Sequence, residues 1–148
     1  MERTSQQKGK FGELWIFGNL IDNGINVYQP MVDEEGVDAI IRKKDGSLLE
    51  IQVKSTRAKD QAGYFNVKAN KLHPKDNLFV VCVDMSPLDA TPARQPEVWI
   101  LPSSTFVHYS TLTSGEYRLA LPGGKIKYGK PLKELLTQYR EAWKLLTG

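Results

Sequence analysis

The segments GVDAII (residues 36–41) and EIQVKS (residues 50–55) predict two neighbouring strands, because the turn-forming sequence KDGS (residues 44–47) lies between them. Successive side chains of a strand point to opposite faces of the sheet. The apolar residues of the second segment therefore share one face, directed into a core, and its polar residues share the other. These polar residues are Glu50, Gln52 and Lys54. A core strand with one polar face predicts contact with water or with a functional site.

The predicted hairpin brings Asp38 close to the second strand. With the turn centred at residues 45–46, an antiparallel register places Asp38 opposite residues 53–54. A carboxylate, an amide and an ammonium group are then expected to converge, from Asp38, Gln52 and Lys54. An exposed hairpin with ordinary polar alternation is the alternative that the spacing leaves open.

Convergent groups of these types suit phosphodiester hydrolysis. A divalent cation held by oxygen ligands stabilises charge on a phosphate and activates water, and a nearby ammonium group positions the phosphate or the water. The hypothesis makes Asp38 the chief ligand of Mg²⁺ or Mn²⁺, with the side-chain oxygen of Gln52 and the backbone carbonyl of Val53 as further ligands. Lys54 is then the catalytic cation.

A helix is predicted over residues 9–23, and it carries a carboxylate on its apolar side. The i+3, i+4 and i+7 neighbours of Glu13 are all large and apolar: Ile16, Phe17 and Leu20. The positive end of the helix favours the ionised form of Glu13, which makes it a candidate catalytic residue and metal ligand, directly or through water. A partly exposed carboxylate at the start of a helix is the alternative.

The remaining pattern predicts an α/β domain with a mixed β-sheet flanked by helices. The two hairpin strands are expected at residues 37–43 and 48–55, and a closing helix at residues 131–146. Turns, a short helix and one or two short strands are expected within residues 102–130. Further strands are expected at residues 25–29, 64–67, 78–84 and 97–101. The length suits one domain over residues 1–148.

Acidic and basic residues alternate in blocks. Residues 11–53 carry a net charge of −5 and residues 54–75 a net charge of +5, within a total of +3. A metal-dependent nuclease needs such a separation, with carboxylates for the cation and bases around them for phosphates; solvated surface charge is the alternative. The candidate nucleic-acid-binding residues are Lys8, Lys10, Arg57, Lys59, Lys68 and Lys71.

The stretch from Lys10 to Ser55 resembles the PD-(D/E)XK superfamily, the restriction-endonuclease-like nucleases, and most of all its small Holliday-junction-resolvase-like members. Asp38 and Gln52-Val53-Lys54 match the positions of the signature, and Gly12-Glu13 matches a Gly-Glu on the family's first helix. The resemblance implies a restriction-endonuclease-like core, a DNA substrate cleaved with Mg²⁺ or Mn²⁺, and a possible homodimer.

Two positions depart from the signature. Gln52 stands where a carboxylate is usual, and Val37 stands where a proline usually precedes the first aspartate. Gln52 can offer an oxygen but no charge. A catalytically inactive nucleic-acid-binding or assembly module with the nuclease fold is therefore a second interpretation. An unrelated small α/β protein with a polar hairpin is a third.

Other classes of function have little support in the sequence. Cys82 is the only cysteine, so we expect no internal disulfide and a reducing, cytoplasmic setting. The polar N-terminus lacks a signal-peptide core, and no apolar run reaches the roughly 20 residues that a membrane helix needs. We therefore expect no membrane association. Neither a Cys/His zinc pattern nor a phosphate-binding loop is present, so we also expect no small organic cofactor.

Overall fold

The computed structural model describes residues 2–32, 36–57, 64–121, 126–127 and 129–148. Its central feature is a five-stranded sheet with strand order β1-β2-β3-β5-β6. Strands β3 and β5 pair in parallel, and the other neighbours pair antiparallel, so the sheet is mixed. The strands of this sheet are β1 (Asn26–Tyr28), β2 (Ala39–Arg42), β3 (Leu48–Thr56), β5 (Leu78–Asp84) and β6 (Glu97–Pro102).

A second, three-stranded sheet with the order β4-β8-β7 lies beside the first. Its strands are β4 (Phe65–Lys68), β7 (Thr111–Thr113) and β8 (Glu116–Leu119). A short pair, β9 (Ile126–Lys127) and β10 (Lys130–Pro131), completes the strands. The helical elements are α1 (Ser5–Asp22), η1 (Ala69–Lys71), η2 (Ser86–Asp89), α2 (Ser103–Tyr109), α3 (Leu132–Leu135), η3 (Thr137–Tyr139) and α4 (Lys144–Thr147).

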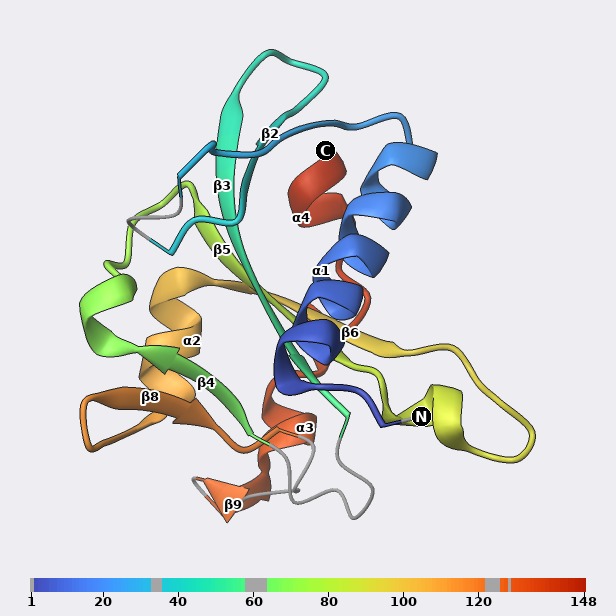
Figure 1. The fold of residues 1–148 in the computed structure, drawn as a ribbon. Helices are drawn as coiled ribbons and strands as arrows, with labels where there is room; N and C mark the ends of the chain where they lie inside the picture. Colours follow the sequence, from blue (N-terminus) through green and yellow to red (C-terminus); the bar gives the residue numbers. More distant parts are fainter. Residues whose placement is uncertain (1, 33–35, 58–63, 122–125, 128) are drawn as a thin grey trace.

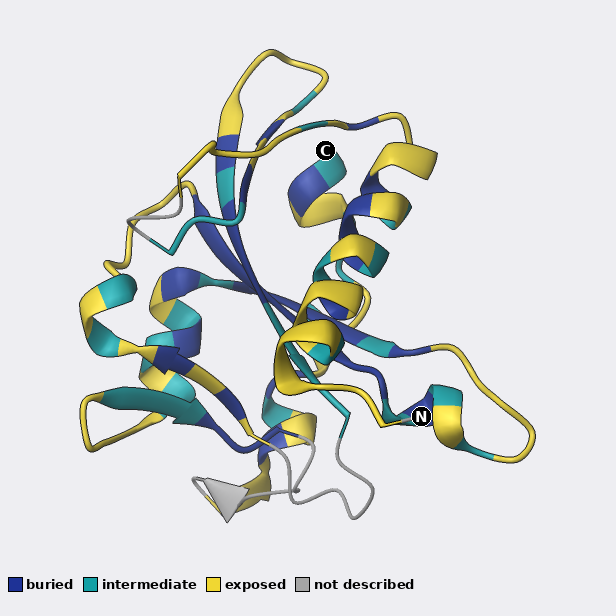
Figure 2. Cartoon of the chain, in the orientation of Figure 1, coloured by how far each residue is buried: buried dark blue, intermediate teal, exposed yellow. Residues whose placement is uncertain are grey.

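The five-stranded sheet separates two apolar clusters. One cluster joins α1 to the sheet through residues such as Ile16, Ile51 and Val81. The other lies on the opposite face, where Val80 and Cys82 of β5 meet side chains of β4, β8 and α2. Every residue of β5 is therefore buried, as expected for a central strand covered on both faces (Figure 2). The predicted α/β class with a mixed, helix-flanked sheet is confirmed.

Helix α1 begins four residues earlier than the predicted residues 9–23. Thr4 is its N-cap: the Thr4 side chain accepts a hydrogen bond from the Gln7 backbone, and the Gln7 side chain accepts one from the Thr4 backbone. This reciprocal capping box stabilises the first turn. The apolar periodicity could not reveal this turn, because residues 5–10 contain no apolar side chain. Among the described residues, no helix combines the length and apolarity required to cross a bilayer.

The predicted closing helix at residues 131–146 is wrong. The segment forms α3, η3 and α4, with extended backbone at Arg140, which bridges to Trp99 of β6. The reason is that the apolar residues serve different cores: Leu132 and Leu136 enter the cluster beneath β4, whereas Leu146 enters the cluster beneath α1. One straight helix cannot reach both faces of a sheet, so the chain passes around the β6 edge.

Helix α1 lies close to β3 at Gly12. A methyl group built on Gly12 would lie 2.5 Å from the Cβ of Ser55 and 2.7 Å from its hydroxyl oxygen. The glycine therefore sets the distance between the helix that carries Glu13 and the strand that carries Lys54. Gly18, on the same helix, has no such neighbour within 4 Å.

We predict that Gly12→Ala destabilises the fold relative to Gly18→Ala by about 1–3 kcal/mol, the usual result of overpacking. Both changes gain the same helix propensity, at most about 1 kcal/mol, so the comparison isolates the clash with Ser55. Urea unfolding followed by circular dichroism measures both. Equal stabilities would contradict the close contact.

Candidate functional site

Asp38 is bonded to β3 through both its backbone and its side chain. Its backbone N–H donates to the carbonyl of Ile51 at 2.9 Å. Its carboxylate oxygen Oδ2 accepts the backbone N–H of Val53 at 2.6 Å. A short bond from an N–H to a charged acceptor is a strong hydrogen bond, so the carboxylate is held in a defined orientation beside the Gln52-Val53-Lys54 segment.

The hairpin register differs by one residue from the predicted one. Ala39 pairs with Ile51, which places Asp38 across from Gln52 and not from residues 53–54. The cause is the turn: Lys43 N–H donates to the Ser47 carbonyl, closing a loop over residues 44–46 with Gly46 at φ +88°. A three-residue loop with a left-handed glycine shifts the pairing relative to a symmetric turn.

The turn itself is stabilised by Asp45. Its carboxylate accepts hydrogen bonds from the Ser47 backbone N–H at 2.9 Å and from the Ser47 hydroxyl at 2.6 Å. These bonds to Ser47 lower the pKa of Asp45. Asp45 is thus an acidic residue with a structural role, one strand length away from Asp38.

Strand β3 continues beyond the end of β2. Strand β2 begins at Ala39, opposite Ile51, so the Val53 N–H has no backbone partner in β2. The Asp38 carboxylate accepts that N–H instead. The N–H and C=O of one strand residue point to the same edge. The Val53 carbonyl therefore points to the same edge of β3 as the Asp38 carboxylate.

Gln52 is buried, with 2% of its surface exposed. Its amide nitrogen Nε2 donates to the backbone carbonyl of Lys71 at 2.6 Å. A carbonyl can accept only from the nitrogen end of the amide, so this bond fixes which end carries the oxygen. The carbonyl of Lys71 follows β4 in the chain, and Gln52 thereby links β3 to the basic segment after β4.

Lys54 points to the same face of β3 as Gln52. In the register it pairs with Cys82 of β5, which is fully buried. Burial raises the pKa of the Cys82 thiol, and the positive charge of Lys54 acts in the opposite direction. Lys54 itself is half-buried and makes no ion pair with another described residue. A half-buried ammonium without a carboxylate partner is suited to receive an anion.

Glu13 lies in the helix turn that contacts Ser55 and has 18% of its side chain exposed. Its ion pair is with Lys10 of the same helix, at 3.3 Å. Within the described ranges, no group of three or more histidine, cysteine or acidic side chains is close enough to hold a metal. A metal site here would depend on the Asp38 carboxylate together with amide and backbone oxygens.

The candidate nucleic-acid-binding residues have different environments. Lys68 is exposed on β4, Lys8 lies on α1 beside the end of β3, and Lys59 falls outside the described residues. Arg57 makes a bidentate pair with Asp89, at 2.9 Å for both bonds, and this pair raises the pKa of Arg57. No local pattern connects Asp89 with Arg57, because 32 residues separate them.

The chain belongs to the PD-(D/E)XK endonuclease family, whose sequence model matches residues 3–115. A search of curated proteins finds no match. Among solved structures, a bacterial homing endonuclease, I-Ssp6803I, has a similar fold, with a TM-score of 0.63 at 22% sequence identity. The similarity covers 98% of this chain and 92% of that one. The resemblance to restriction-endonuclease-like nucleases is thereby confirmed, as is the fold class.

We predict that Gln52→Glu destabilises the protein at pH 7 by about 1–3 kcal/mol, because a carboxylate would face the Lys71 carbonyl with no proton to donate. Burial raises the pKa of an introduced carboxyl group, and its protonated form can restore the bond. The introduced carboxyl group therefore contributes favourably to the free energy of unfolding at low pH. This contribution is lost as the pH rises through the folded-state pKa of that carboxyl group.

Thermal unfolding at several pH values between about 4 and 8 measures this effect. Gln52→Met, which loses the bond without adding a titrating group, should show a loss that varies little with pH. Gln52→Glu stability equal to wild type at pH 7 would show that the bond to Lys71 is unimportant.

Proposed function

We propose that this protein is a metal-dependent endonuclease that hydrolyses phosphodiester bonds in DNA. The observation that carries the proposal is the bond between the Asp38 carboxylate and the Val53 N–H, which ties the first signature residue to the Gln-x-Lys strand. Membership of the PD-(D/E)XK endonuclease family supports nuclease activity. The similar solved structure is that of a homing endonuclease, which favours DNA as the substrate.

The oxygen donors around Asp38 fit Mg²⁺ or Mn²⁺. A carboxylate, a backbone carbonyl and an amide oxygen are the hard ligands that these cations prefer. Asp38 would hold the ion with the Val53 carbonyl and the Gln52 oxygen. The Asp38 carboxylate retains lone pairs after accepting one N–H, and Glu13 is the proposed source of a second charge. A bound ion would supply Lewis acidity towards the phosphate oxygens.

The chain's own residues supply the rest of the chemistry. The Val53 N–H holds the Asp38 carboxylate, so little side-chain freedom is lost when an ion binds. The Lys54 ammonium, which has no ion pair among the described residues, balances negative charge that develops on the phosphate. We assign Asp38, Gln52, Lys54 and Glu13 to this site within one nuclease domain spanning residues 1–148. Two copies of the chain would be needed to cut both strands at once, so we include a homodimer in the proposal.

A DNA-binding module without catalysis is the second candidate. Gln52 favours it, because the amide carries no charge and its nitrogen is engaged with Lys71. Such a module would keep the fold and the basic surface but would not need Lys54 to remain without an ion-pair partner. The two functions differ in cleavage and share DNA binding.

We predict that Asp38→Asn abolishes cleavage of a supercoiled plasmid in Mn²⁺ while the thermal stability stays near that of wild type. An asparagine oxygen can still accept the Val53 N–H, so this change removes charge without leaving that donor unpaired. Lys54→Met should lower cleavage by about 10²–10³-fold, a usual loss for a group that stabilises transition-state charge.

Asp45→Asn is the matched control, because it removes a carboxylate from the turn of the same hairpin. Its cleavage rate should equal that of wild type. If Asp38→Asn cleaves as well as Asp45→Asn, the catalytic site is wrong. If wild type binds DNA without cutting any form in Mn²⁺, the binding-module interpretation replaces the nuclease.

We predict that Lys68→Glu weakens DNA binding and lowers the salt dependence of the binding constant by about one or more units of slope, as expected when a phosphate contact is lost. Lys44→Glu makes the same charge change at the exposed turn of the hairpin. Fluorescence anisotropy at several salt concentrations compares the two. Equal slopes would assign Lys68 to ordinary solvated surface.

A further inference from the structure

A pocket lies between the first turns of α1 and the end of β3. Its volume is about 240 Å³. Its lining includes Ser5, Lys8 and Gly9 on the helix, Ser55 and Thr56 at the end of the strand, and Arg57 directly after it. These residues carry two positive charges and three hydroxyl groups, and none of the described residues that line the pocket has a carboxylate.

The guanidinium of Arg57 is only partly satisfied. Its side chain is 9% exposed, and its Nε and Nη2 atoms donate to Asp89. The remaining nitrogen, Nη1, is buried and has no hydrogen-bond partner within the described part of the chain. A buried donor without an acceptor is unfavourable, so the Arg57 guanidinium, which lines the pocket, has hydrogen-bonding capacity that the described part of the chain leaves unused.

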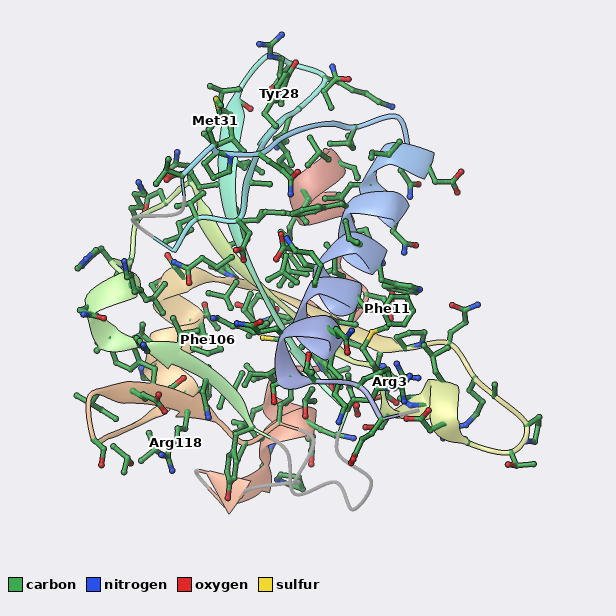
Figure 3. All side chains as sticks on the ribbon, viewed as in Figure 1. Arg3, Phe11, Tyr28, Met31, Phe106 and Arg118 are labelled. Atoms are coloured by element: carbon green, nitrogen blue, oxygen red, sulfur yellow. The ribbon has the colours of Figure 1, made fainter. Side chains whose placement is uncertain are left out.

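The local charges also favour an anion. Asp89 is shared between two arginines, Arg57 at 2.9 Å and Arg3 at 3.9 Å. Figure 3 shows Arg3 and Phe11 on the side of α1 that faces the η2 segment, and the Arg57 guanidinium lies 5.7 Å from the centre of the Phe11 ring. Among the described residues, the Asp89 carboxylate therefore pairs with two guanidinium groups, and Lys8 lines the pocket as a further positive charge.

We propose that this pocket is a seat for a single backbone phosphate of the DNA substrate, separate from the phosphate that is cut. This inference rests on the proposed function. In this seat a phosphate oxygen accepts a hydrogen bond from the Arg57 guanidinium, and Lys8 supplies a second positive charge. The hydroxyl groups of Ser5, Ser55 and Thr56 are further donors. Arg57 lies three residues after Lys54, about 10 Å along an extended strand. The seat lies on the α1 side of β3 and Lys54 on the other face, so the two contact different phosphates of the substrate backbone.

Gly9 offers a test that avoids disturbing the Arg57–Asp89 pair. A Cβ atom built at Gly9 meets nothing within 4 Å, and Gly9 lines the pocket. Gly9→Glu therefore adds a carboxylate at the pocket without a backbone clash. Gly18→Glu is the matched control, because Gly18 lies on the same helix, also has open space around it and is not a pocket residue.

The experiment measures binding of a closed circular duplex, and of linear duplexes with 5′-phosphate or 5′-hydroxyl ends, in EDTA. We expect Gly9→Glu to bind all three about tenfold or more weakly than Gly18→Glu, the size of a lost charge-assisted bond. Equal affinities of the two variants overturn the proposal. A loss confined to 5′-phosphorylated DNA also overturns it, and assigns the pocket to a terminal phosphate. EDTA prevents metal-dependent cleavage, so weaker binding by Gly9→Glu supports the phosphate seat even if the protein cuts no DNA. If wild type cleaves DNA but the two variants bind it equally, the phosphate seat is refuted and the nuclease proposal is not.

Discussion

The site depends on an unequal pairing of one strand: β3 has neighbours on both edges up to Ile51 and, beyond that, pairs with β5 alone. A long strand with a short neighbour leaves backbone groups without partners inside a folded domain, which is unfavourable unless another acceptor or donor takes them. The Asp38 carboxylate takes the first of these positions. The same early end of β2 opens the edge to which the Val53 carbonyl points. A single difference in strand length thus positions the carboxylate and leaves the Val53 edge of β3 without a partner in β2.

The alternating side chains of β3 then give its two faces different roles. Ile51 and Val53 join the apolar cluster beneath α1, and Gln52 and Lys54 lie on the opposite face. Both faces are covered for part of their length, so the polar side chains are not simply solvated. Gln52 donates to the Lys71 carbonyl, whereas Lys54 makes no ion pair among the described residues. Packing therefore holds the site from both sides of the sheet, and the Gly12 contact fixes where the helix with Glu13 lies.

Much of this could be predicted from short-range patterns. The alternation in residues 48–55, the glycine in the turn and the apolar run at residues 78–84 are local signals, and they identified the hairpin and the central strand. What escaped prediction depends on groups far apart in the chain. The bond from Gln52 to Lys71 and the pair of Arg57 with Asp89 have no local signature. The shifted register of Asp38 arose from loop closure at Ser47, and the closing helix failed because a regular leucine spacing does not say which core each leucine enters.

The C-terminal segment has a consequence for how copies of this protein meet. Strand β6 is the last strand of its sheet, and such a strand presents unpaired N–H and C=O groups that can recruit a strand from another molecule. Here the Val98 carbonyl accepts the Glu141 N–H at 2.8 Å, the Val98 N–H donates to the Glu141 carboxylate at 3.2 Å, and Arg140 bridges to Trp99. A carboxylate again takes a strand N–H where regular pairing ends, as Asp38 does on β3. On β6 the effect is protective, because the occupied edge offers less of a template for aggregation through intermolecular β-sheet.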